Sequence, residues 1–474
     1  MIRMRCFIFR KEMVYNYAYI FLLLTFILCS CANQLPPPGG EDDITPPKVI
    51  SITPKPNTIN FKGRSIIIEF DEYVDRRSFE ESIFISPKPK GEISFDWSGT
   101  EVEIEFDKQL DIGKTYTFVI NKDLKDARGG NSITEPIKFA VSTGSIIDKG
   151  EISGKVYTDN IDKVVILAFI LTSENENDID PSKKVADYVI QVNSTGDYAF
   201  ENLPSKRFRL FALKDYDRNL LYDKGFDEIA VLSQDLFVND TIKINNADFL
   251  MEDLKPNLTS NVFLNSLNKD SIDFIYSSVK NNDKKIPVDN RFYFYFKNND
   301  LSKLDLVNNI QLVDTTSRKS YKPVFNWYSD SLLEIFSIDK FKYSSVIKLI
   351  IDLQNTKRKY LYELLFKVAG EKEYGEVSGK VVDRDTLNAP IYIELFNKDN
   401  PLVNYSRNIE NDSLFVFEDV FEGVYRLFSF VDEDNDGVFD RGNYFPFKPS
   451  ERFIIYPDIN LNGGWSVDNV YIRF

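Results

Sequence analysis

Strict alternation of apolar and polar residues is the main pattern of this chain. Glu101-Val-Glu-Ile-Glu-Phe106 places three apolar side chains on one face and three glutamates on the other, as in a strand with one buried face. Similar runs occupy residues 66–70, 116–120 and 292–296, and Gly, Asn, Asp and Pro separate them. After the first thirty residues we find no convincing amphipathic helix. Short strands at this spacing predict an all-β fold of sandwiches or barrels.

The chain also contains two copies of one module. Gly150-Glu-Ile-Ser-Gly-Lys-Val156 returns as Gly375-Glu-Val-Ser-Gly-Lys-Val381. The match extends to the Asp-rich segments that begin at Asp215 and Asp432. Self-similarity over such a length predicts that both copies have the same fold.

A second, weaker repeat pairs the segments upstream of these copies, around Trp97 and Trp327. We interpret both tryptophans as packing residues beside core strands. The chain then consists of tandem β-sandwich modules in an A-B-A′-B′ arrangement. The expected boundaries are a signal peptide at 1–30, a Pro/Gly-rich tether at 31–47, A at 45–146, B at 148–253, A′ at 258–370 and B′ at 372–474.

The first thirty residues are typical of a bacterial lipoprotein signal peptide. Four basic residues precede an apolar run from Ala18 to Leu28, which would rise only about 17 Å as a helix and is too short to span a bilayer. Leu28-Cys-Ser-Cys31 resembles a lipobox, which implies cleavage before Cys31 and lipid on its thiol. The alternative is an ordinary secretory signal. We expect the lipid to bind the protein to the outer membrane, where the protein lies at the cell surface or faces the periplasm.

Composition restricts the chemistry of the mature part. The chain has no histidine, and its three cysteines are Cys6, Cys29 and Cys31. A Ser-His-Asp triad, a cysteine nucleophile and a Cys/His zinc site therefore cannot form there. Cleavage before Cys31 removes four basic residues and one acidic residue, so the net charge falls from −15 to −18. Such a charge disfavours nucleic acid as a partner, and we predict that the protein is not an enzyme.

Module A contains four motifs: Thr45-Pro-Pro-Lys-Val, Ile66-x-Ile-x-Phe-Asp-Glu-x-Val-Asp75, Asp126-x-x-Gly-Gly-Asn131 and Phe139-x-Val-x-Thr143. Through these motifs it resembles the bacterial Ig-like domain of the S-layer type, and the resemblance extends less strongly to A′. The B modules are similar to carboxypeptidase-regulatory or transthyretin-like domains, through Gly154-Lys-Val and Gly196-Asp-Tyr-Ala-Phe in B and Gly423-Val-Tyr-Arg-Leu in B′. Such combinations resemble surface lipoproteins of the Bacteroidetes, which implies a location and a fold but no catalytic residues.

Two motifs raise the question of a bound ligand. Gly150-x-x-x-Gly-Lys155 is one residue shorter than a phosphate-binding loop and is followed by Val156 where Ser or Thr is needed, so we reject nucleotide binding. The second motif is Asp432-x-Asp-x-Asp-Gly-x-x-Asp440, which has the spacing of the first part of a Ca²⁺ loop. The alternative is an acidic hairpin turn.

The expected calcium ligands are Asp432, Asp434, Asp436 and Asp440 with the carbonyl of Val438. Asn443 stands where a bidentate glutamate is expected. The corresponding, weaker set in B is Asp215, Asp217, Asn219 and Asp223, with Leu220 in place of the glycine.

Function divides into two hypotheses. The first is a structural, adhesive or protein-contact module of the cell envelope. The second is a glycan-binding accessory lipoprotein of a polysaccharide-uptake system, for which Trp465, flanked by glycines, is the residue to test for sugar stacking. The partner is then an envelope protein or a glycan, and no cofactor is required apart from the hypothetical Ca²⁺.

Overall fold

The structure is a computed structural model that describes residues 43–269, 275–296, 309–354, 359–383, 389–410 and 413–474. Its regular structure is almost entirely β-sheet, and most strand pairs are antiparallel, which confirms the all-β sandwich prediction. The predicted signal peptide, Cys31 and most of the tether lie outside the described residues. Among the residues described, no helix has the length and apolar character needed to cross a bilayer.

Module A is a sandwich of the sheets β1-β2-β5-β4 and β3-β6-β7. The alternating run of β5 places Val102, Ile104 and Phe106 in the core, as predicted. Helix α2 adds Phe79, whose ring packs edge-to-face on Trp97. The elements are β1 (Val49–Thr53), β2 (Ser65–Phe70), α2 (Arg76–Ser82), β3 (Ile83–Ser86), β4 (Ile93–Ser98), β5 (Glu101–Phe106), β6 (Thr115–Ile120) and β7 (Ile137–Ser142).

Module B pairs a sheet of order β10-β9-β12-β13, in which β14 also joins β12, with a sheet of order β11-β8-β15, in which β16 also joins β8. Strands β15 and β16 run parallel to β8. The elements are β8 (Gly150–Tyr157), β9 (Val164–Leu171), β10 (Tyr188–Gln191), β11 (Asp197–Leu203), β12 (Lys206–Lys214), β13 (Glu228–Val231), β14 (Leu236–Val238), β15 (Lys243–Ile244) and β16 (Phe249–Leu250).

Module B′ repeats this topology, with sheets β29-β28-β31-β32 and β30-β27-β33. The rejected phosphate-loop motif lies within β8 and its counterpart within β27, so its glycines have a packing role. A Cβ on Gly154 would lie 2.1 Å from the Ala247 oxygen, and one on Gly379 would lie 2.0 Å from the Val470 oxygen. The elements are β27 (Tyr374–Val382), β28 (Ile391–Asn397), β29 (Asn404–Ile409), β30 (Leu414–Phe421), β31 (Gly423–Val431), β32 (Phe453–Leu461) and β33 (Ser466–Arg473).

Module A′ is also a two-sheet sandwich, with orders β17-β18-β20-β24-β23 and β19-β26-β25-β21-β22. Trp327 packs against its core, as Trp97 does in A, which confirms the packing role expected for both. The elements are α3 (Asn261–Ser266), β17 (Asn268–Lys269), β18 (Ile275–Ser277), β19 (Asp283–Ile286), β20 (Phe292–Phe296), β21 (Ile310–Asp314), β22 (Ser320–Tyr321), β23 (Pro323–Trp327), β24 (Leu332–Ser337), β25 (Val346–Gln354), β26 (Lys359–Val368) and η1 (Glu371–Glu373).

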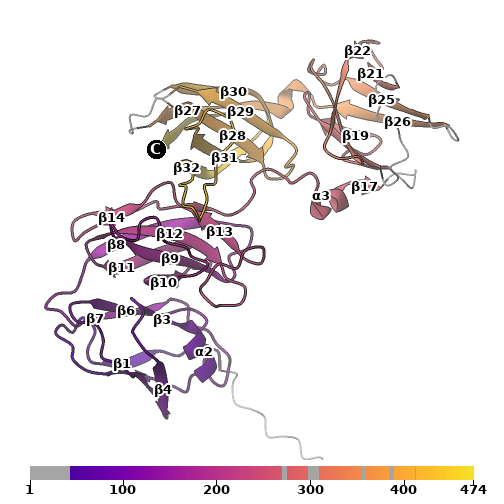
Figure 1. The fold of residues 1–474 in the computed structure, drawn as a ribbon. Helices are drawn as coiled ribbons and strands as arrows, with labels where there is room; N and C mark the ends of the chain where they lie inside the picture. Colours follow the sequence, from indigo (N-terminus) through magenta and orange to yellow (C-terminus); the bar gives the residue numbers. More distant parts are fainter. Residues whose placement is uncertain (1–42, 270–274, 297–308, 355–358, 384–388, 411–412) are drawn as a thin grey trace, which may run out of the picture.

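The modules do not follow one another in a simple line. A, B and B′ are stacked in that order, whereas A′ lies to the side of B′ (Figure 1). A loop between β31 and β32 extends from B′ to B near β13 (Figure 1). The chain therefore leaves B, forms A′, and returns so that B′ packs on B.

Candidate metal centres

The Asp-rich segment of B′ forms the loop between β31 and β32. Asp432 is fully buried, with 0% of its surface exposed, and its carboxylate accepts the N–H groups of Asp436 at 3.2 Å and Gly437 at 2.9 Å. Oxygens of Asp432, Asp434 and Glu451 all lie within 4.8 Å of one another. Carboxylates from both ends of the loop thus converge at one point.

Glu451 is the member of this group that the sequence motif does not identify. Its Oε1 accepts the N–H of Glu433 at 2.8 Å and its Oε2 accepts that of Asp440 at 2.9 Å. Burial raises the pKa of the Glu451 carboxyl. The Ca²⁺-loop template expects an acid at position 12, but this loop is longer, and its closing acid stands just before β32. The sequence signal that could have identified this ligand is an acidic residue just before the strand that follows the loop.

The other predicted ligands of this loop have different partners. Asp436 accepts the N–H of Val438 at 2.7 Å, and the Val438 side chain is exposed. Asp440 accepts the N–H of Gly442 at 2.8 Å and forms an ion pair with Lys448. The hydrogen bond from Lys448 lowers the pKa of Asp440. Of the predicted side chains, the structure brings only Asp432 and Asp434 into the carboxylate group.

The corresponding loop of B, between β12 and β13, has the same construction. Asp215, 2% exposed, meets Asp217 and Asp227 within 4.8 Å, and burial raises the pKa of Asp215. Asn219 donates from its amide to Asp217 at 3.0 Å and to Asp223 at 2.8 Å. That amide already satisfies carboxylate oxygens that a cation would otherwise bind.

Asp227 takes the place that Glu451 has in B′. It accepts the N–H groups of Tyr216 at 3.1 Å and Asp223 at 2.9 Å, which are the repeat counterparts of the two groups bound by Glu451. The backbones also agree, because Leu220 has φ +63° where Gly437 has φ +76°. The three-acid arrangement is therefore a property of the B module and not of one loop alone.

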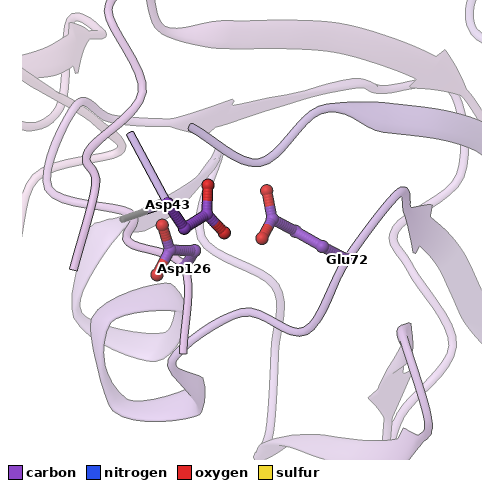
Figure 2. A group of neighbouring side chains, drawn as sticks. All are labelled: Asp43, Glu72 and Asp126. Atoms are coloured by element: carbon purple, nitrogen blue, oxygen red, sulfur yellow. The ribbon is translucent and has the colours of Figure 1, made fainter. Parts of the chain in front are cut away.

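A third carboxylate group lies in module A. Carboxylate oxygens of Asp43, Glu72 and Asp126 lie within 4.8 Å of one another, and the side chains of Asp43 and Glu72 face each other (Figure 2). Burial, followed by repulsion from Asp43 and Asp126, raises the pKa of Glu72. Burial opposes ionisation of Asp126, but hydrogen bonds from the Asn131 amide at 2.6 Å and from the Gly130 N–H at 2.8 Å outweigh it, so the pKa of Asp126 is lowered. Glu72 and Asp126 belong to two different motifs of the four that resemble the Ig-like family, and the sequence did not indicate that these two motifs are neighbours.

The donor type and spacing of the B′ group fit a hard cation. Calcium binds carboxylate and carbonyl oxygens at about 2.3–2.6 Å, so ligands on opposite sides of the ion lie up to about 5 Å apart. Each carboxylate oxygen has two lone pairs, and one backbone hydrogen bond leaves the second lone pair available. Asp432, Asp434 and Glu451 would hold such an ion, and further ligands would have to be carbonyls or water.

Trp465 lies in the turn that precedes β33. Its side chain is 66% exposed, and Gly464 beside it has φ +75°. The Trp465 carbonyl accepts the N–H of Glu376 at 3.1 Å, which fixes the backbone and leaves the indole in solvent. The indole is free to stack on a ligand ring.

Comparison with known proteins places one part of the chain in a family. Residues 43–143 match the bacterial Ig-like domain family, in agreement with the resemblance predicted for module A. No curated protein matches the chain in sequence.

Solved structures give only distant similarities. An L,D-transpeptidase from Mycobacterium smegmatis is 16% identical, with 35% of this chain and 76% of that one covered at a TM-score of 0.16. The N-terminal part of the bacterial S-layer protein SbsC is 14% identical, with 41% and 44% covered at 0.16. BcpA, the major pilin subunit of Bacillus cereus, is 10% identical, with 69% and 99% covered at 0.18. Similarities of this size carry no conclusion about function.

Proposed function

We propose that this protein is a lipid-anchored, non-catalytic component of the bacterial cell envelope whose β-sandwich modules provide structural or adhesive contact surfaces. The observation that carries the proposal is the bacterial Ig-like domain at residues 43–143, directly behind a leader that ends in the lipobox-like Leu28-Cys-Ser-Cys31. The anchor would hold the modules at the membrane, with the Ig-like domain nearest to it. The outer membrane is the proposed location.

The buried charged groups support a structural role. Glu334, 1% exposed, accepts hydrogen bonds from Arg291 at 2.9 Å and from the Tyr293 hydroxyl at 2.8 Å. Asp235 forms a two-bond pair with the buried Arg209, at 2.9 and 2.8 Å. In such pairs the charged groups form strong hydrogen bonds to one another inside the sandwich.

We further propose that B′ binds Ca²⁺ through Asp432, Asp434 and Glu451, and that the B loop binds it more weakly. Support comes from the recurrence of the same three-acid arrangement in both B modules. Binding would offset the mutual repulsion of carboxylates in the loop that also reaches module B. The ion would then stabilise the fold and take no part in a reaction.

The test of the main proposal is capture of partners by the lipidated full-length protein on intact cells, followed by mass spectrometry. We expect envelope proteins to be recovered, in amounts that do not change when Trp465→Ala replaces the wild type. The same two proteins should be applied to a glycan array. Glycan retention that is lost in Trp465→Ala but kept in Tyr471→Ala, a control at another exposed aromatic residue, would favour the polysaccharide-uptake role and contradict the first proposal.

A further inference from the structure

In module B, the sheet of order β10-β9-β12-β13 is apolar on both faces. In β9, Val164, Ile166 and Ala168 face the core between the two sheets. The alternate residues Leu167 and Phe169 are equally buried, in a second cluster on the outer face. A sheet with two apolar faces requires cover on both sides, so the outer face of B needs a partner.

Module B′ supplies part of that cover through residues 440–450, which we call the docking loop. Phe447 packs edge-to-face on Phe211 at 6.1 Å between ring centroids, and the Arg209 guanidinium lies 3.7 Å from the Phe447 ring centroid. Tyr444 contacts Tyr222 with ring centroids 4.6 Å apart. The docking loop therefore inserts aromatic side chains into the second apolar face of B.

Backbone contacts fix the docking loop where it returns to B′. The Ser450 N–H donates to the Leu232 carbonyl at 3.2 Å. A Cβ on Gly442 would lie 2.6 Å from a Val231 methyl carbon, so the Gly442 backbone lies directly against the Val231 side chain. Such a fit is typical of a close-packed protein interior, in which a single added methyl group disturbs the packing.

Cover is also provided in the opposite direction. Leu250, at the end of B, is buried with Phe396, Phe428 and Phe430 on the outer face of B′. Arg441 donates to the carbonyls of Leu250 at 3.1 Å and of residue 252 at 2.7 Å. Each B module thus covers apolar surface of the other.

The docking loop is specific to the second copy. In B, Asp227 follows Asp223 by four positions, whereas in B′ Glu451 follows Asp440 by eleven. The additional residues include Tyr444 and Phe447, which make the contacts with B. An insertion that otherwise leaves the repeat intact and that carries the contact residues has a docking role.

We propose that B and B′ form one cooperative folding unit, latched within a single chain by the docking loop, with A′ inserted as a side module. Separation would expose Phe211 and Leu213 on one side and Phe428 and Phe430 on the other. Exposure of large apolar side chains to water is unfavourable in proportion to the apolar area exposed, so the separated modules are disfavoured. The unit therefore keeps a fixed B–B′ geometry, while A′ projects beside it (Figure 1).

The test uses a disulfide across the latch, in the mature chain carrying Cys31→Ala, which has no other thiol after residue 30. Val231→Cys with Gly442→Cys joins an outer-face residue of B to the docking loop, because a Cβ on Gly442 would lie 2.6 Å from a Val231 methyl carbon, which puts the two Cβ atoms within reach of a disulfide. We expect efficient cross-linking inside a monomer on mild oxidation. The control pair Val231→Cys with Tyr471→Cys, at an exposed position of β33, should not cross-link. An absence of cross-linking, or disulfide-linked dimers, would overturn the proposal.

Hydrogen exchange tests the same latch without a cross-link. Phe447→Ser with Tyr444→Ser should lower protection at least tenfold in β12 and β13 of B, which lie far from the substitutions in sequence. Far-UV circular dichroism should show that B′ remains folded, and Tyr471→Ser, on the exposed face of β33, should leave β12 and β13 unchanged. Unchanged protection in the double variant would contradict a shared unit.

Discussion

At the residue scale, the acids of the B modules combine burial with unusual proximity. Asp432 and Asp215 are almost fully enclosed, and each is held by backbone N–H groups of its own loop. A buried carboxylate without a paired cation is costly. The nearby carboxylates increase that cost, and a divalent ion would reduce it.

We expect Ca²⁺ to stabilise the mature chain. At ten times Kd, binding contributes about 1.4 kcal/mol, which raises the melting temperature of the B–B′ unit by a few degrees. Asp434→Ala should remove most of the shift, because it removes an exposed ligand of the B′ site and leaves only the weaker loop of B. Differential scanning calorimetry of the whole mature chain is the measurement, since an isolated B′ would lose its cover from B.

Two controls complete the calcium test. Equal Mg²⁺ should reproduce little of the shift, because Mg²⁺ demands octahedral geometry and gives up water reluctantly. Asp458→Ala removes an acid in β32 that is paired with Lys398 outside the loop, and its calcium shift should remain. Identical melting curves in millimolar Ca²⁺ and in chelator would show that neither loop binds Ca²⁺ and that both are acidic turns.

The pH dependence follows from the same buried acids. The pKa values of Asp215 and Glu451 are raised by burial, so the folded state binds their protons more tightly than the unfolded chain does. Their contribution to the free energy of unfolding therefore falls as the pH rises from the unfolded pKa through the folded pKa. Calcium competes with these protons, and its stabilising effect should be larger at pH 7 than at about pH 4. Calorimetry at both pH values measures this, and a calcium shift of equal size would argue against these ligands.

At the element scale, the glycine-containing strands β8 and β27 bring two backbones into contact. Gly379→Ala would place a Cβ 2.0 Å from the Val470 oxygen, and backbone cannot move aside as a flexible side chain can. We expect the substitution to cost about 1–3 kcal/mol or to prevent folding. Chemical denaturation should show this loss, whereas Glu376→Ala in the same strand should change stability by less than about 0.5 kcal/mol.

At the scale of the whole molecule, the predicted lipid anchor decides where the modules act. We expect the mature protein to fractionate with membranes and to carry acyl chains on Cys31, whereas Cys31→Ala should be released or should accumulate as uncleaved precursor. Immunoblots of membrane and soluble fractions measure where the protein is found. Mass spectrometry of the N-terminal peptide measures its acylation and its cleavage. An unmodified N-terminus at another residue would contradict the lipobox interpretation. Protease treatment of intact cells would then distinguish surface exposure from a periplasm-facing orientation.

Much of the architecture follows from the sequence, because local rules suffice for it. Alternation in β5 identifies a half-buried strand without knowledge of its partner, since the side chains of any strand alternate between two faces. The internal repeat requires both B modules to share a topology, as their sheets do. Absence of histidine and of cysteine after Cys31 excludes whole classes of catalysis by composition alone.

The tertiary structure decided what depends on contacts between distant residues. Glu451 joins Asp432 and Asp434 only because β32 returns beside β31, and no local spacing rule extends across a loop of that length. Likewise, the fully apolar β9 indicates a sheet buried on both faces, but not that Phe447 of another module covers it. Strand periodicity is set within a few residues, whereas ligand convergence and module docking are set by how the sheets pack.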